Sequence, residues 1–436
     1  MLEPMRAGAS PHRPLTAGEL TLLFSPLFTV ALGYGAVLPI LPSILERVHA
    51  AGVQGAVALH AGLLSGFYIG AFVIAAPLWG KVTDLRGPRT VLLIGLLGYA
   101  AATVWFGFAA SLEAAYAARF VAGSFAAGLL PATSAMIVAR CQGEARARHL
   151  AWVSTASIAG FLVGPALTGW VHDFVADPKV QWAGALHATA VPIWTTGALA
   201  LACAVGVAWG GVGSWNPDDR EETTATPTSP TRRNAARRIL LFSVVGAFGL
   251  GSFEVGLSLQ SQQLWRWSAS ALGWLFAICS LVMLTIQLGL FARLRHLVGL
   301  NGLVIGGFAA MATGFTFLGG TSAYFLVALL VMLIASGSGV LLPTLSLAMS
   351  DQVDGSKVGT AIGYQNAVSN LGQAAGSAGV GLLFSVLPRA SFAVMAALMF
   401  VAAVSAWLIA RLPGSLLGVA APALQSSQPV DGNVRR

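Results

Sequence analysis

The chain has 436 residues, of which 56% are hydrophobic and 9% charged, and it carries a formal net charge of +8. With a mean hydropathy of +0.77, a water-soluble globule is excluded, because too little polar surface is available to cover it. The sequence therefore predicts an integral membrane protein, whose few charged residues have to be interpreted against lipid.

Twelve apolar segments are predicted to cross the membrane. A helix of about 20 residues spans a hydrocarbon core of about 30 Å, and backbone polar groups cannot remain unpaired in lipid, so each segment is expected to be α-helical. The first has no small-residue cleavage site, so we expect it to be retained and not removed as a signal peptide. In chain order the predicted spans are 20–41, 61–79, 90–110, 113–138, 150–172, 189–212, 238–262, 270–292, 301–319, 321–349, 357–386 and 390–411.

A charged segment rich in proline and threonine divides these spans six and six. This segment and the two ends of the chain are too short and too polar to fold alone. We therefore predict an all-α membrane protein built from two pseudo-symmetric six-helix bundles. The predicted division is a cytoplasmic tail at 1–19, a first bundle at 20–212, a cytoplasmic linker at 213–237, a second bundle at 238–411 and a cytoplasmic tail at 412–436.

The distribution of lysine and arginine residues predicts the orientation of the protein in the membrane. If the amino terminus is cytoplasmic, 19 of the 24 lysines and arginines fall in cytoplasmic segments and 4 in outside segments, and Arg119 lies within the fourth span. Membrane proteins carry their excess of Lys and Arg on the cytoplasmic side. We expect both termini in the cytoplasm and a location in the cell membrane, the inner membrane of a bacterium. These basic loops account for the net charge without a nucleic-acid partner.

The second half of the chain repeats the first. A constant shift of 212 positions lays the Leu-Leu-Pro triplet at 129–131 on the triplet at 341–343. The same shift lays Gly160, Gly164 and Gly169 on Gly372, Gly376 and Gly381. Transporters with repeats in the same orientation rock one half against the other around a central site.

Four motifs follow one another along the chain. They are Pro39-Ile-Leu-Pro42 in the first span, Gly80-Lys-Val-Thr-Asp84-Leu-Arg86-Gly87-Pro-Arg89 after the second, Arg119-Phe-Val-Ala-Gly123 in the fourth and Gly160-x3-Gly164-Pro165-x3-Gly169 in the fifth. With the twelve predicted spans and the central linker, they resemble the major facilitator superfamily, in particular its 12-helix drug/proton antiporters. Ala122 stands where that family often has glutamine.

The resemblance implies that the loop after the second span belongs to a cytoplasmic gate. The gate residues would be Gly80, Asp84, Arg86, Gly87 and Arg89. Asp84 can neutralise a helix amino terminus, and the nearest candidate in the other half is the segment 356–358. This contact would close the cytoplasmic side and break when the carrier turns inward. The equivalent loop in the second half of the chain has Arg293 in place of the aspartate, so the contact is expected from the first half only. Alternatively, Asp84 is an ordinary loop residue exposed to water.

Gly160, Gly164, Pro165 and Gly169 form the predicted antiporter motif. Glycines spaced by four allow two helices to approach closely, and Pro165 bends the helix. In the exporters that the chain resembles, this bend favours a pocket that opens outward without leaking protons. Ordinary packing of small residues is the alternative.

Two charged residues, Arg119 and Glu254, are predicted to lie in the outer half of the membrane. They are about six and about eight residues from the outer ends of their spans, or roughly 9 and 12 Å deep. Burial favours the uncharged form of a carboxyl and a nearby arginine favours the charged form. Glu254 is therefore expected to carry the proton, with Arg119 as the partner that expels proton or substrate. A static ion pair, or a Glu254 that faces lipid, is the alternative; the first span has no acidic residue, unlike several relatives.

Substrate contacts are predicted from polar residues within the spans. Tyr34 lies in the first span, and Asn366, Asn370 and Gln373 lie at i, i+4 and i+7 of the eleventh, which places them on one helical face. Such a face lines either a cavity or a helix interface, and both remain open.

No catalytic constellation is present. The sequence has no His-Glu-x-x-His and no Gly-x4-Gly-Lys-Ser/Thr motif, and its seven histidines show no metal-ligand spacing. We expect no enzyme activity, no metal and no cofactor. Without a nucleotide loop, an ion gradient has to drive transport.

The predicted function is a secondary active transporter. It would export a small amphipathic or aromatic compound, a drug or metabolite, by proton-coupled alternating access. Its partners would be this substrate, protons and the bilayer, without nucleic acid, and a functional monomer is expected. The alternatives are an importer of the same fold or an exporter of a sugar or amino acid, and, in another class, a membrane sensor or lipid-modifying enzyme.

Overall fold

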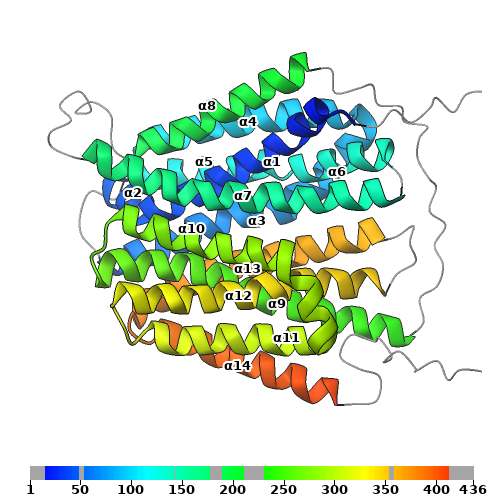
Figure 1. Ribbon diagram of the computed structural model, residues 1–436. Helices are drawn as coiled ribbons and strands as arrows, with labels where there is room; N and C mark the ends of the chain where they lie inside the picture. Colours follow the sequence, from blue (N-terminus) through cyan, green and yellow to red (C-terminus); the bar gives the residue numbers. More distant parts are fainter. Residues whose placement is uncertain are drawn as a thin grey trace, which may run out of the picture.

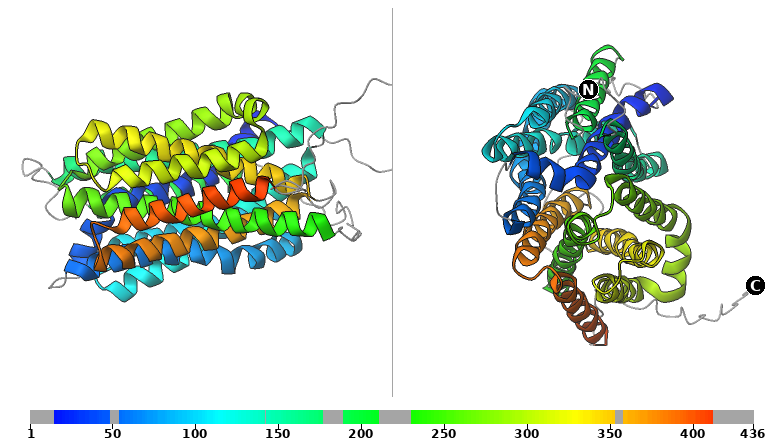
Figure 2. Two further views of the ribbon diagram at one scale, coloured as in Figure 1. Left: turned by 90° about the horizontal axis from the view of Figure 1, so that it is seen from below. Right: turned by 90° about the vertical axis from the view of Figure 1, so that its left-hand side faces the viewer.

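A computed structural model describes residues 15–48, 54–141, 143–176, 189–210, 230–352 and 358–411. Within these ranges the secondary structure is helical and contains no strand. The long helices run side by side in one bundle (Figure 1), and a view along them separates the first half of the chain from the second (Figure 2, right). The predicted all-α class is confirmed.

Eight helices are described in the first half of the chain. They are α1 (Ala17–Val37), α2 (Leu41–Val48), α3 (Gln54–Arg86), α4 (Pro88–Phe108), α5 (Leu112–Ala126), α6 (Leu129–Arg140), α7 (Gly143–Ala176) and α8 (Ala190–Trp209). α1 begins at a capping box, in which Thr16 and Glu19 satisfy each other's backbone N–H groups. Between α1 and α2 the chain takes a 3₁₀ turn at Leu38–Ile40 that contains Pro39, because proline removes an α-helical hydrogen bond.

The described helices of the second half follow the same up-and-down course. They are α9 (Pro230–Leu259), α10 (Ala269–Thr285), α11 (Phe291–Leu318), α12 (Tyr324–Ser350), α13 (Val358–Val386) and α14 (Ser391–Ala410), with π-turns at Gln260–Leu264 and Ile286–Leu290. The side chain of Ser268 caps α10 by accepting from the N–H of Ala271 at 3.1 Å.

Ten stretches of the described residues are long and apolar enough to cross a membrane. One of them, Ala269–Leu318, has 50 residues and would measure about 75 Å as a single straight helix. It contains both α10 and α11, and Gly299 within it has a non-helical backbone with φ of 68°. α13 is not among the ten, so the predicted number of twelve stays a prediction.

The helices extend beyond several predicted boundaries. α3 continues to Arg86, past the predicted end of the second span at residue 79, and α9 begins at Pro230, so residues 230–237 of the predicted linker are helical. A span predicted from hydropathy ends where polar residues begin. A helix can continue into water beyond that point, as long as its backbone hydrogen bonds are made. The rest of the linker, residues 1–14 and residues 412–436 lie outside the described residues.

The internal repeat is visible in the packing. Gly160 and Gly164 of α7 lie against the carbonyl groups of Phe28 and Leu32 in α1. Their repeat partners in α13, Gly372 and Gly376, lie in the same way against Val244 and Phe248 of α9. None of these four positions has room for a Cβ, which explains why glycine recurs at one constant offset.

The two halves meet closely at the end of the bundle that holds α2, which we call the sealed end. There α3 packs against α13, and α7 packs against α10. Gly62 of α3 lies against the backbone of Ser377 and Gly381, and Gly169 of α7 against that of Ala269. Ser258 also donates its hydroxyl to the carbonyl of Leu38 at 2.6 Å. Among the described residues, the two halves are thus in backbone contact across both seams at this end.

The same pair of helices lacks this contact toward the opposite end. Gly80 lies 18 residues after Gly62, and Gly363 lies 18 residues before Gly381; 18 residues are five helical turns and return to the same face. A Cβ at Gly80 or Gly363 would meet nothing within 4 Å. The close backbone contact that joins α3 and α13 at the sealed end is therefore not repeated at Gly80 and Gly363, about 27 Å further along the bundle.

Candidate functional site

A cavity of about 310 Å³ lies between the two halves. Helices α1, α3, α5, α6 and α7 of the first half and α9, α10 and α13 of the second supply its walls. Most of the lining is aliphatic or aromatic, including Phe72, Phe161 and Phe253. The polar lining side chains are Tyr34, Tyr68, Ser157, Glu254, Ser280, Asn370 and Gln373. Among the described residues Glu254 is the single charged side chain of this lining.

Glu254 sits on α9 and is only 4% exposed. The hydroxyl of Tyr34 donates to its Oε2 at 2.6 Å, and Nε2 of Gln373 donates to the same oxygen at 3.1 Å. Tyr34 belongs to the first half and Gln373 to the second. A carboxyl group at this depth is costly unless it is hydrogen-bonded, and these two donors provide that stabilisation from both halves.

The other oxygen of Glu254, Oε1, remains available. It accepts no hydrogen bond from the described residues, and it is not among their enclosed polar atoms that lack a partner. Glu254 itself lines the cavity, the space that a substrate or a proton would enter. Glu254 thus faces the cavity and not lipid.

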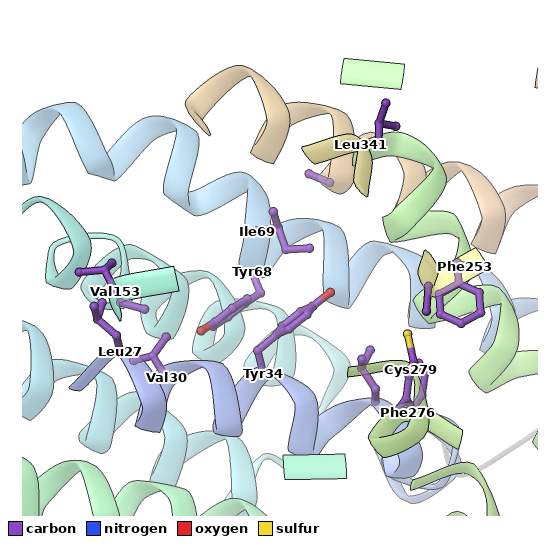
Figure 3. Close-up of a cluster of buried hydrophobic side chains, with 14 of the residues drawn as sticks. Leu27, Val30, Tyr34, Tyr68, Ile69, Val153, Phe253, Phe276, Cys279 and Leu341 are labelled. Atoms are coloured by element: carbon purple, nitrogen blue, oxygen red, sulfur yellow. The ribbon is translucent and has the colours of Figure 1, made fainter. Parts of the chain in front are cut away.

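Arg119 lies behind the cavity wall. Its guanidinium carbon is 4.1 Å from the ring centre of Tyr68 and 5.5 Å from that of Phe106, a distance at which a cation is attracted to an aromatic face. Arg119 is 5% exposed, and its Nε has no hydrogen-bond partner among the described residues. The ring of Tyr68 is stacked on that of Tyr34, with centres 5.5 Å apart and planes inclined by 14°, as Figure 3 shows.

The predicted pair Arg119 and Glu254 is therefore brought to one site without direct contact. Among the described residues these two side chains form no ion pair, so the alternative of a static Arg119–Glu254 pair is not seen. Contacts through Tyr68 and Tyr34 connect them instead. The roles in proton coupling remain predictions.

The predicted substrate face of α13 is divided between the cavity and its surroundings. Asn370 and Gln373 line the cavity, together with Tyr34, whereas Asn366 is not among the lining residues. Gln365, on another face, donates to the hydroxyl of Ser243 on α9 at 3.0 Å. The cavity interpretation therefore fits Asn370 and Gln373, whereas the helix contact is made by a residue outside the predicted face.

The predicted gate loop forms a tight connection between α3 and α4. Gly87 has φ of 82° and ψ of 154°, a conformation that favours glycine, and it precedes α4. Arg89 donates to the carbonyl of Ala208 at 2.6 Å and so satisfies the end of α8. Gly80, Asp84 and Arg86 lie at the end of α3. The predicted partner residues Ser356 and Lys357 lie outside the described residues.

The fifth-span motif packs on both sides of α7. Gly160 and Gly164 contact α1 within the first half, whereas Gly169 contacts α10 of the second half. The carbonyl of Pro165 lies directly against Gly273, also on α10. Close packing across the seam is thus the visible role of this motif, and its meaning for antiport remains a prediction.

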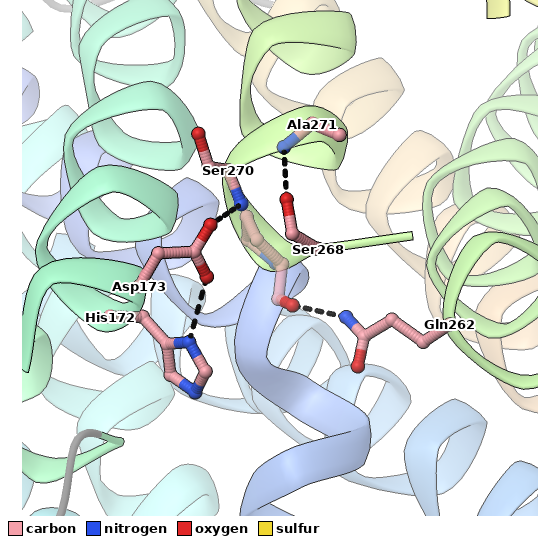
Figure 4. A network of polar contacts seen from close by, with 7 residues as sticks. His172, Asp173, Gln262, Ser268, Ser270 and Ala271 are labelled. Carbon is pink, nitrogen blue, oxygen red and sulfur yellow. Dashed lines mark hydrogen bonds and ion pairs between the residues drawn. The ribbon is translucent and has the colours of Figure 1, made fainter. Parts of the chain in front are cut away.

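Sequence reasoning missed Tyr68 and the polar contacts of the sealed end. Asp173 of α7 accepts a hydrogen bond from the N–H of Ser270 at the start of α10, at 3.2 Å, and Gln262 donates to the carbonyl of Pro39 (Figure 4). His172 lies 3.3 Å from the carboxylate of Asp173. In the sequence, the only signal for Asp173 was its place in a polar pair with His172 at the end of a predicted span. Tyr68 could not be singled out, because aromatic residues are frequent in such helices.

A helical membrane protein with two repeated halves and a cavity between them has the architecture of a carrier. The model of the Major Facilitator Superfamily matches residues 23–293, which is more than half of the chain. The protein therefore belongs to the Major Facilitator Superfamily, whose members are multi-pass membrane transporters of small molecules and not enzymes. Among the described residues no group of three or more His, Cys, Asp or Glu could hold a metal ion.

Relatives of known identity include drug-resistance proteins. The chain is 25% identical to Multidrug resistance protein 2 of Bacillus subtilis (strain 168) over 380 residues, which cover 84% of this chain and 88% of that protein. It is 27% identical to the class G tetracycline resistance protein of Vibrio anguillarum over 361 residues, covering 81% and 87%. These matches bear out the predicted resemblance to drug/proton antiporters.

Solved structures share the fold. A bacterial homolog to the human lysosomal transporter Spinster, in an inward-facing and occupied conformation, matches with a TM-score of 0.71 and 15% identity, covering 95% of this chain and all of that one. A D-xylose–proton symporter matches with a TM-score of 0.70 and 14% identity, covering 92% and 99%.

Proposed function

We propose that this protein exports a small amphipathic or aromatic compound, a drug or metabolite, in exchange for protons by alternating access. The observation that carries the proposal is the apolar cavity between the halves with Glu254 as its single charged lining residue in the described part of the chain. The relatives named for multidrug and tetracycline resistance support the class of substrate and the direction.

The chemistry of the cavity favours this substrate class over a sugar. A sugar displays a hydroxyl on nearly every carbon and needs many buried hydrogen-bond partners, since a buried polar group without one is costly. Here aromatic rings from four helices, such as Phe72 and Phe161, face the cavity, and most of the other lining side chains are aliphatic. A flat apolar compound would bury its rings against these side chains and use Glu254 for orientation.

Glu254 would link the proton to the substrate. A carboxyl in this apolar site is neutral when it binds a proton and charged when it releases one, and only the charged form attracts a basic group of a substrate. Proton and substrate then alternate on the same residue, so the inward flow of one drives the outward movement of the other. Arg119, behind Tyr68, would favour the charged form of the site and so promote proton release.

The distribution of positive charge supports an orientation with both termini in the cytoplasm. The sealed end then faces outward, and the end at which α3 and α13 lack this contact faces the cytoplasm. The arrangement corresponds to an inward-open carrier. We expect a functional monomer.

A transport assay tests the proposal. The purified protein is reconstituted into inside-out vesicles with an acidic lumen, and the lumen pH is followed while aromatic cations, tetracycline and sugars are added separately. The expected result is proton release on addition of an aromatic compound, absent in Glu254→Gln and retained in Glu46→Gln, which alters an exposed carboxyl of α2. Gradient-independent uptake of a sugar or amino acid without proton release would favour the importer alternative.

A further inference from the structure

The two side chains that donate hydrogen bonds to Glu254 both donate to the same carboxyl oxygen. Tyr34 and Gln373 share Oε2, whereas Oε1 accepts no hydrogen bond from the described residues. A carboxylate accepts at two oxygens with about four lone-pair positions, so the division is a property of this site and not of the group. The protein thereby separates an oxygen held by two donors from an oxygen that accepts no such bond within the described part of the chain.

The tyrosine that holds Oε2 is itself fixed by its own half of the chain. Its ring is stacked on Tyr68, and the ring of Phe161 lies 6.0 Å away on another side. On the same helix, Gly35 packs directly against the ring of Pro165. The hydroxyl of Tyr34 therefore reaches Glu254 from a position set by α3 and α7, with little freedom to follow α9 if the halves move apart.

We infer that Tyr34 is the positioning residue through which the first half of the carrier responds to the protonation of Glu254, an inference that rests on the proposed function of this site. When Glu254 is charged, the 2.6 Å bond from Tyr34 joins the halves. When Oε1 takes up a proton from the cavity, the bond becomes one between neutral groups. Charge-assisted hydrogen bonds are about twice as strong as neutral ones, so protonation weakens this link between the halves.

The other groups that face Glu254 do not offer the same link. Tyr68 on α3 contacts the ring of Tyr34, and Arg119 on α5 lies beyond it. Cys279 on α10 lines the same cavity but forms no hydrogen bond to the carboxyl among the described residues. Gln373 on α13 does bond to Glu254, but it belongs to the same half and moves with it. Among the described residues of the first half, Tyr34 is thus the one that donates a hydrogen bond directly to Glu254.

Infrared spectroscopy of the reconstituted protein tests the inference without a substrate. The stretching band of a protonated carboxyl that disappears in Glu254→Gln is titrated with pH in the wild type and in Tyr34→Phe. Phenylalanine keeps the ring stacked on Tyr68 and removes only the hydroxyl. Because the charged form of Glu254 then loses one of two donors, the midpoint of the titration is expected to move up by about one pH unit.

Two further variants separate this role from a structural one. Tyr116→Phe removes a hydroxyl that contacts Nδ1 of His60 at 2.9 Å, away from Glu254, and should leave the midpoint unchanged. Gln373→Leu removes the second donor and should also raise it. A Tyr34→Phe protein that titrates like the wild type would overturn the inference. Failure of the proposed function would show itself differently, as an intact titration without compound-induced proton release in the vesicle assay.

Discussion

Gly381 offers the sharpest test of how the sealed end is held. A Cβ at Gly381 would lie 2.8 Å from Cα of Gly62 on the other half and closer still to the carbonyl of Ala58. The obstacles are backbone atoms of another helix, so a side-chain rotation cannot relieve them. In Gly381→Ala, α3 and α13 have to separate at this point.

The magnitude follows from the cost of inserting a methyl group into packed backbone. Overpacking of this kind costs about 1–3 kcal/mol, and every 1.4 kcal/mol is about a tenfold change in an equilibrium. The ratio of sealed to unsealed molecules should therefore fall by about 5- to 150-fold. A carrier that spends nearly all its time sealed at this end would then show a second population.

Distances between spin labels measure that population. Nitroxides on Glu46→Cys of α2 and Arg389→Cys after α13 report on the two halves at the sealed end, and the three native cysteines are buried. Gly381→Ala should add a longer distance to the distribution. Gly363→Ala, on the same face of α13 with nothing within 4 Å, should keep the wild-type distribution. Identical distributions for Gly381→Ala and the wild type, in a folded protein, would refute the reasoning.

Three further outcomes are expected. Gly87→Ala places a side chain at φ of 82° and ψ of 154°, which costs about 1–3 kcal/mol, so the thermal unfolding midpoint in detergent should fall. Asp173→Ala removes the acceptor of the Ser270 N–H, at a cost of about 0.5–2 kcal/mol, and the same spin labels should report more of the longer distance. Arg119→Lys keeps the charge but loses the planar group over Tyr68; its unfolding midpoint should drop, and an unchanged midpoint would argue against a stabilising contact there.

Much of the architecture could be predicted from local sequence. Runs of apolar residues predict membrane helices because each helix satisfies its own backbone within lipid, and α4, α8 and α14 agree closely with three such runs. The constant offset between repeated glycines predicted two similar halves, since glycine is needed wherever a helix approaches a backbone. The packing of Gly160 on α1 and of Gly372 on α9 confirms that reasoning.

The candidate site was predictable in part. A charged residue within an apolar run is rare enough to be noticed, and Glu254 indeed lines the cavity. The depth of Arg119 within its span was predicted in the same way. Its contact with Tyr68 was not predicted, because the depth of a residue does not tell in which direction its side chain points. That direction depends on the rotation of α5 and on the ring of Tyr68, which reaches Arg119 from another helix.

The sequence by itself determined a membrane protein of repeated helices with two buried charges, because hydrophobicity and helical spacing act within a single segment. Only the tertiary structure decided which groups meet. Tyr34 and Glu254 are 220 residues apart and come from different halves, and the sealed end exists because α3 meets α13 and α7 meets α10. Such contacts depend on how far one half is tilted against the other, and a carrier changes that tilt while its sequence stays the same.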